Sequence, residues 1–187
     1  MPKTLEGSCQ CGLVEFKLES QPQPFPCYQI VPRKGNSNSK IIQSHTPVPY
    51  QLCACSICRK CGGYGGSVNL GGIASTLQIT KGSDSVKKYT ATKDRGLPTA
   101  EKCTSERNFC SECATMLWLW DKTWPELIHP FASAIDTELP VVEEMVCVKA
   151  NSKPAYVRWP EGKKSVHENY GEDSIEGWHK KRGLFVE

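Results

Sequence analysis

The sequence lacks the signals of membrane, secreted and nucleic-acid-binding proteins. Its 187 residues contain no apolar run of transmembrane length. Residues 1–6 form no apolar stretch, so we expect no secretory signal. The net charge is only +3 and no long basic block is present, which argues against a nucleic-acid partner. We therefore expect a cytoplasmic protein with no membrane partner and no nucleic-acid partner.

Long helical patterns are also scarce. The 15 glycines, 13 prolines and many short apolar segments are typical of a loop-rich, mainly β protein that forms one domain. Alternating apolar and charged residues predict a half-buried strand over 14–18. Further strands are expected at 77–80, 86–89, 116–120, 141–149 and 155–159. Residues 91–105 are polar and predict a loop, and Asp173 and Gly183 bracket a short C-terminal helix.

Cysteine, by contrast, is abundant. Seven of the eleven cysteines lie in three tight clusters. The clusters are Cys9 with Cys11, Cys53 with Cys55 and Cys58, and Cys110 with Cys113. A disulfide between Cys9 and Cys11, or between Cys53 and Cys55, would close a very small and strained ring. The odd count and the expected reducing compartment favour metal ligation over disulfides.

The spacing of the clusters predicts two different metal sites. Zinc prefers a tetrahedron of thiolates, and two closely spaced cysteine pairs close one four-cysteine site. The central cluster supplies only three nearby thiolates, which is the pattern of a catalytic zinc with an open position. We therefore predict two zinc ions, one structural and one reactive. Cys27, His45 and Cys61 are weak candidates for a further ligand, since none of them has ligand spacing.

The three clusters and their neighbours resemble a known family. The motifs are Gly7-x-Cys9-x-Cys11-Gly12-x-Val14, Cys53-x-Cys55-x-x-Cys58-Arg59-Lys60 and Phe109-Cys110-x-x-Cys113. In this order they resemble the glutathione-dependent formaldehyde-activating enzyme family, which includes centromere-protein-V-like proteins. The resemblance runs from about Gly7 to Trp120 and more faintly to the end. Ala114 departs from it, because the family usually has glycine after the last cysteine.

The resemblance implies a fold, a chemistry and a set of site residues. The fold is a β-tent of small antiparallel sheets organised by zinc knuckles. We expect its core at about 7–160, with a C-terminal extension at 160–187 and a Pro-rich insertion at 20–49 that is longer than usual for the family. The chemistry is that of a carbon–sulfur lyase acting on a thiol adduct, with glutathione or its adduct as the small-molecule partner. By position, Cys9, Cys11, Cys110 and Cys113 match the structural zinc ligands. Cys53, Cys55 and Cys58 match the catalytic zinc ligands.

Other residues and other functions remain open at this point. Arg59 follows the central cluster and is a candidate catalytic residue that offsets its negative charge or holds a substrate carboxylate; as an exposed cation it could equally be solvated. Arg107 is a weaker candidate for the same role. One alternative function is a non-catalytic, zinc-stabilised binding or chaperone module. Another is a lyase or dehydratase of a specialised pathway with a substrate larger than formaldehyde.

Overall fold

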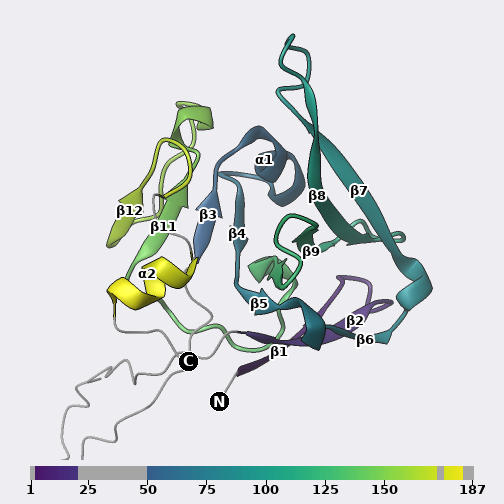
Figure 1. Cartoon of the computed structure of the whole chain (residues 1–187). Helices are drawn as coiled ribbons and strands as arrows, with labels where there is room; N and C mark the ends of the chain where they lie inside the picture. The colour runs from purple at the N-terminus through teal and green to yellow at the C-terminus, as the bar shows by residue number, and fades with distance from the viewer. Residues whose placement is uncertain (1–2, 21–49, 172–174, 183–187) are drawn as a thin grey trace, which may run out of the picture.

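The computed structural model describes residues 3–20, 50–171 and 175–182, and strands dominate this part of the chain. Three small sheets are accompanied by two short helices, α1 (Ser56–Gly62) and α2 (Ile175–Lys181) (Figure 1). The prediction of a mainly β protein with a short C-terminal helix is confirmed. Residues 21–49 of the predicted Pro-rich insertion, which include Cys27 and His45, lie outside the described residues, as do parts of the C-terminal extension.

The first sheet has three antiparallel strands. They are, in spatial order, β1 (Lys3–Ser8), β2 (Glu15–Ser20) and β6 (Gln78–Lys81). The predicted alternation holds, because Val14, Phe16 and Leu18 are buried while Glu15 is exposed. The ring of Phe16 packs edge-on against Trp118 at 5.0 Å between centroids, which joins this sheet to the second one.

The second sheet has five antiparallel strands. They are β5 (Gly72–Ile73), β10 (Leu127–Pro130), β9 (Met116–Asp121), β8 (Glu101–Cys110) and β7 (Val86–Lys93). The loop predicted at 91–105 is confirmed at 94–100 and wrong on either side, since β7 continues to Lys93 and β8 begins at Glu101. Most residues near the tip of this ribbon are exposed, so the segment shows no apolar alternation that would have identified it.

The third sheet is mixed rather than antiparallel. Its strands are β12 (Lys164–Val166), β11 (Met145–Val148), β3 (Gln51–Cys53) and β4 (Ser67–Asn69). Strand β11 pairs in parallel with both β12 and β3, while β3 and β4 are antiparallel. The strand predicted at 155–159 is wrong: Val157 N donates a hydrogen bond to Pro154 O at 3.1 Å in a turn.

Short 3₁₀ turns connect several strands. They are η1 (Ala74–Thr76), η2 (Ser83–Ser85), η3 (Ala132–Ala134) and η4 (Ala150–Ser152). Each is a single turn, which is the length at which this helix type is usual.

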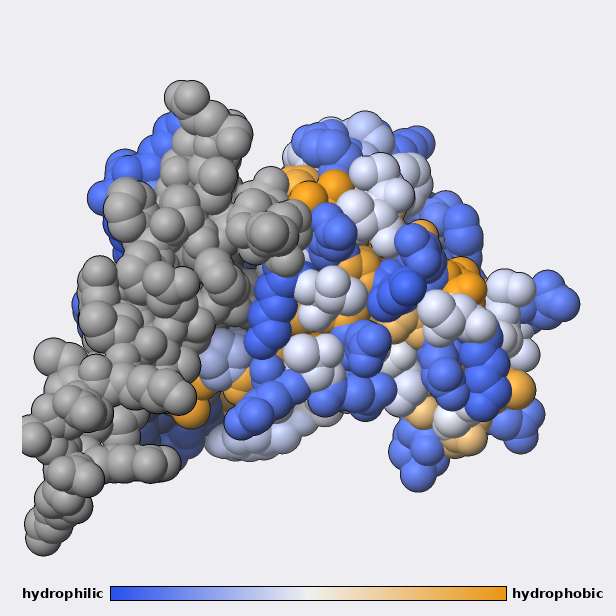
Figure 2. All heavy atoms as spheres, turned by 90° about the horizontal axis from the view of Figure 1, so that it is seen from below, coloured by the Kyte–Doolittle hydropathy of each residue, from blue (hydrophilic) through white to orange (hydrophobic). Residues whose placement is uncertain are grey.

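Two groups of buried residues form the hydrophobic core. The larger group includes Leu5, Phe16, Leu117 and Trp118. The smaller group joins Cys53 and Cys58 to Val146 and Val148 of β11, with Trp178 of α2 packed against it. The face seen in Figure 2 is hydrophilic over most of its described part, with apolar residues in small separate spots. Neither described helix has the length and apolarity that a bilayer span requires.

Candidate metal centres

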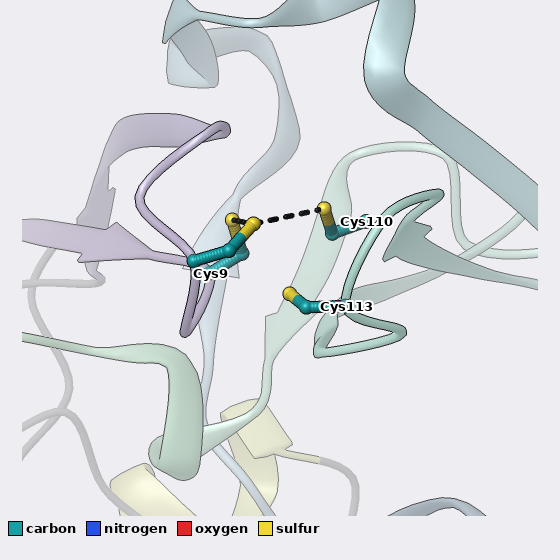
Figure 3. A group of neighbouring side chains, drawn as sticks. Cys9, Cys110 and Cys113 are labelled. Atoms are coloured by element: carbon teal, nitrogen blue, oxygen red, sulfur yellow. Dashed lines mark hydrogen bonds between the residues drawn. The ribbon is translucent and has the colours of Figure 1, made fainter.

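Four thiols from two hairpins meet at one point. Cys9 and Cys11 lie in the connection between β1 and β2, Cys110 ends β8, and Cys113 lies in the turn before β9. Their Sγ atoms all lie within 4.8 Å of one another, and we call them the four-thiol group (Figure 3). The Sγ distances are 3.4 Å from Cys9 to Cys11 and 3.9 Å from Cys11 to Cys110. A zinc–sulfur bond of about 2.3 Å gives a tetrahedral edge of about 3.8 Å, so this spacing could hold one metal ion.

The two turns that carry these thiols share a backbone feature. Gly12 N donates to Cys9 O and Ala114 N donates to Cys110 O, each at 2.9 Å. In both turns the residue after the second cysteine has a positive φ, 70° for Gly12 and 59° for Ala114. Glycine reaches this region without steric cost, whereas alanine does not. The departure from the family pattern at Ala114 therefore places a strained residue in this turn.

Hydrogen bonds to two of the four sulfur atoms, those of Cys9 and Cys113, favour the thiolate form. Val14 N donates to Cys9 Sγ at 3.2 Å. Thr115 Oγ1 accepts from Gln10 N at 3.1 Å and lies 3.2 Å from Cys113 Sγ, so its hydroxyl proton is available to the sulfur. The side chain and backbone of Thr115 lower the pKa of Cys113 to about 5. Sequence reasoning missed Thr115, which contacts both turns of the group.

The three remaining clustered thiols also converge. Cys53 ends β3, Cys55 is the N-cap residue of α1, and Cys58 lies inside α1. Their Sγ atoms lie within 4.8 Å of one another and form what we call the three-thiol group. Cys53 and Cys58 are buried and Cys55 is half-buried. Cys55 Sγ accepts a hydrogen bond from Cys58 N at 3.3 Å, the role that an Asp or Ser oxygen usually has at a helix start.

Crowding separates the pKa values of the three thiols. Hydrogen bonds from Cys53 and Cys58 lower the pKa of Cys55, with a further contribution from the Cys58 backbone. The same contacts with Cys55 dominate the raised pKa of Cys53, and contacts with both neighbours raise that of Cys58. Three adjacent thiols therefore do not all ionise on their own. A bound divalent cation would favour ionisation of all three, so the group could hold a metal ion.

The structure places Arg59 in α1 beside the three-thiol group. Its Nη1 donates to the carbonyl oxygens of Ala54 and Ser152, which ties α1 to η4. These bonds give Arg59 a structural role, and its predicted catalytic role remains a prediction. Cys61 is also in α1, but it lies outside the group, and burial raises its pKa. All the described cysteines are free, so no disulfide forms among them.

Tyr170 lies near the three-thiol group although it is distant in sequence. Lys149 follows β11, whose Val148 pairs with Cys53. Lys149 N donates to Asn169 O at 2.7 Å, and its Nζ lies 4.6 Å from the centroid of the Tyr170 ring. Although Tyr170 is exposed as a whole, desolvation of its hydroxyl, followed by the charges of the three thiols, raises its pKa to about 12. The sequence around Tyr170 offers no motif that would have identified it.

Sequence comparison relates the chain to known proteins. The profile of the family described as "Glutathione-dependent formaldehyde-activating enzyme" matches residues 38–151, which include the three-thiol group. A protein of Halomonas elongata named "Putative glutathione-dependent formaldehyde-activating enzyme" is 39% identical over 182 residues, covering 96% of this chain and 97% of the relative. A crystal structure of a Rhodobacter sphaeroides protein is 18% identical and covers 72% of this chain and 91% of that one. Its TM-score of 0.43 is too low to inform function.

Proposed function

We propose that this chain, which belongs to the family of glutathione-dependent formaldehyde-activating enzymes, is a zinc-dependent carbon–sulfur lyase. Its substrate is the adduct of a thiol, such as glutathione, with an aldehyde or a related small electrophile. The observation that carries the proposal is the three-thiol group, in which three free thiols gather within 4.8 Å. In the described part of the chain no fourth metal-ligating residue joins them, which leaves room for a substrate sulfur.

The proposed reaction is a reversible addition. A zinc ion held by the three-thiol group would lower the pKa of a thiol in the fourth position, so that this thiol is ionised at neutral pH. In one direction the thiol sulfur bonds to the aldehyde carbon, the carbon–oxygen π bond breaks, and the oxygen takes up the proton that the thiol released. In the other direction the carbon–sulfur bond breaks and the aldehyde and thiol are returned.

Local structure fixes the three sulfur atoms for this role. Ala54, between the first two cysteines, donates from its N–H to Val148 O at 3.0 Å and is fully buried. Arg59 holds the carbonyl of Ala54 from the next turn of α1. The Cys58 N–H orients the sulfur of Cys55. The thiols are therefore set by the end of β3 and the start of α1 before any ligand binds.

The four-thiol group supports the fold in this proposal. Four thiolates fill a tetrahedron and leave no position for a substrate. A zinc ion there would join the β1–β2 hairpin to the β8–β9 hairpin and contribute to the folding free energy. This division gives one closed site and one open site.

Metal content and thiol binding test the proposal with a matched pair of variants. Cys55→Ser removes a member of the three-thiol group, whereas Cys103→Ser changes a half-buried cysteine of β8 that belongs to neither group. We expect two zinc ions per chain in the wild type and Cys103→Ser, and one in Cys55→Ser with an unchanged circular dichroism spectrum. Cleavage of the glutathione–formaldehyde adduct should be lost in Cys55→Ser alone.

Cobalt substitution separates an enzyme from a binding module. Millimolar glutathione should change the thiolate-to-cobalt absorption of the wild type and leave that of Cys55→Ser unchanged. An unchanged wild-type spectrum, or two metal ions retained in Cys55→Ser, would contradict the proposal and favour a non-catalytic, zinc-stabilised module.

A further inference from the structure

A buried serine on β4 connects two members of the three-thiol group. Ser67 is the first residue of β4 and is only 5% exposed. In the antiparallel pairing of β3 with β4 it lies opposite Cys53. Its hydroxyl donates a hydrogen bond to the carbonyl oxygen of Cys58 at 3.0 Å. One side chain of β4 therefore holds α1, which carries Cys58, against the strand that carries Cys53.

The third thiol is joined to the same series of contacts. Helix α1 follows β3 and precedes β4, so it lies at one end of this strand pair (Figure 1). Within α1, Cys58 N donates to Cys55 Sγ at 3.3 Å. A shift of the Cys58 main chain would therefore move the sulfur atoms of Cys55 and Cys58 together, relative to that of Cys53. The Ser67 hydrogen bond opposes such a shift.

Two glycines allow β4 to approach this closely. A Cβ added at Gly62, the last residue of α1, would overlap the hydroxyl oxygen of Ser67. A Cβ added at Gly66 would overlap the carbonyl oxygen of Cys53. Gly66 also has a φ of 132°, a conformation that glycine adopts without steric cost. The connection from α1 to β4 is therefore packed tightly against the end of β3, which leaves the Ser67 hydroxyl little freedom to move away from Cys58 O.

We propose that Ser67 is a positioning residue that sets the separation of the sulfur atoms in the three-thiol group, and with it the affinity of that group for a divalent metal ion. This inference rests on the proposed function, which places a zinc ion there. Sulfur atoms that are already held at the spacing of the metal-bound state lose less conformational freedom on binding, so the affinity is higher. If Ser67 only stabilised the fold, its loss would lower stability without a selective effect on one metal site.

Zinc affinity in a matched pair of variants distinguishes these roles. Ser67→Ala and Thr76→Val each remove a hydroxyl that donates to a backbone carbonyl, that of Cys58 for Ser67 and that of Ile73, at 2.7 Å, for Thr76. Thr76 lies in η1 and belongs to neither thiol group. The dissociation constants of both zinc ions would be measured on the full chain by competition with a chromophoric chelator. Repeating Ser67→Ala in the Cys55→Ser background reports on the four-thiol group alone.

We expect Ser67→Ala to weaken the binding of one of the two zinc ions by about tenfold. Loss of a residue that orients a metal ligand typically costs about tenfold to a hundredfold in affinity, and the lower end applies because Ser67 bonds to the main chain of Cys58 and not to its sulfur. In the Cys55→Ser background, Ser67→Ala should leave the remaining ion within about twofold. Thr76→Val should lower the thermal midpoint as Ser67→Ala does, yet keep the affinities of both ions.

Other outcomes overturn the inference in distinct ways. Unchanged affinity for both ions in Ser67→Ala assigns the residue to fold stability alone and leaves the proposed function standing. Weakening of the remaining ion in the Cys55→Ser background shows that the effect is not confined to the three-thiol group. If the wild type binds a single zinc ion and Cys55→Ser retains it, the proposed function itself fails and the inference fails with it.

Discussion

Replacing Ala114 by glycine should stabilise the protein although it removes a methyl group. Ala114 is exposed and has a φ of 59° in the turn between Cys113 and β9. A left-handed conformation costs a non-glycine residue about 1–2 kcal/mol. Glycine avoids that cost, but its greater freedom in the unfolded chain costs about 0.4–1 kcal/mol. The midpoints of these ranges give a net gain in the free energy of unfolding of about 0.8 kcal/mol, within limits of about 0 to 1.6 kcal/mol.

Differential scanning calorimetry of the metal-loaded protein measures this gain. In a chain of 187 residues, 1 kcal/mol shifts the thermal midpoint by about 2–4 °C, so we expect a rise of about 1–4 °C. Gly12→Ala is the matched control, because Gly12 has a φ of 70° and no atom lies within 4 Å of an added Cβ. It should lower the midpoint by a similar amount. A fall in Ala114→Gly, or a shift of the same sign in both variants, would refute the reasoning.

Two further predictions concern metal removal and pH. If the four-thiol group holds zinc as proposed, a strong chelator should unfold the protein reversibly, since a structural zinc supplies about 10–16 kcal/mol and domains are stable by about 5–15 kcal/mol. A chelated, metal-free chain with an unchanged circular dichroism spectrum and thermal midpoint would contradict this. Burial lowers the pKa of His129, so the unfolded chain takes up a proton first and stability falls as the pH drops below about 6.5. His129→Asn keeps a donor for Leu70 O and removes the titration, so its denaturant midpoint should fall less between about pH 7 and 5.5 than that of the wild type. An equal fall of the denaturant midpoint in the two proteins would show that His129 does not contribute to the pH dependence of stability.

The grouping of the clustered thiols could be predicted because it depends on chemistry and spacing. Three clusters of seven cysteines predicted one group of four and one of three, and the structure brings the thiols together in those groups. The strand with buried Phe16 and Leu18 could likewise be predicted from the sequence, since the alternation of apolar and charged residues indicates which face of a strand is buried. Both signals are contained within short stretches of sequence.

The surroundings of the three-thiol group could not be predicted in the same way. Helix α1 is only seven residues long and begins at a cysteine N-cap, so it shows neither a helical period nor a usual start signal. The parallel pairing of β3 with β11 joins segments far apart in the chain. The position of Tyr170 follows from that pairing, because Lys149 comes directly after β11 and its N–H donates to Asn169 O. The local sequence around these residues does not indicate such contacts.

The two thiol groups also differ in when they can be completed during protein synthesis. Cys11 and Cys110 are 99 residues apart, whereas Cys53 and Cys58 are five apart. Loop-closure entropy makes the longer connection costlier by about 2–3 kcal/mol before any contact forms. A nascent chain that has just emerged past Cys58 already carries the whole three-thiol group, but the four-thiol group must wait for Cys113. If both groups bind metal as proposed, translation order favours loading of the three-thiol group first, and a second ion would then reinforce the contacts between the two hairpins.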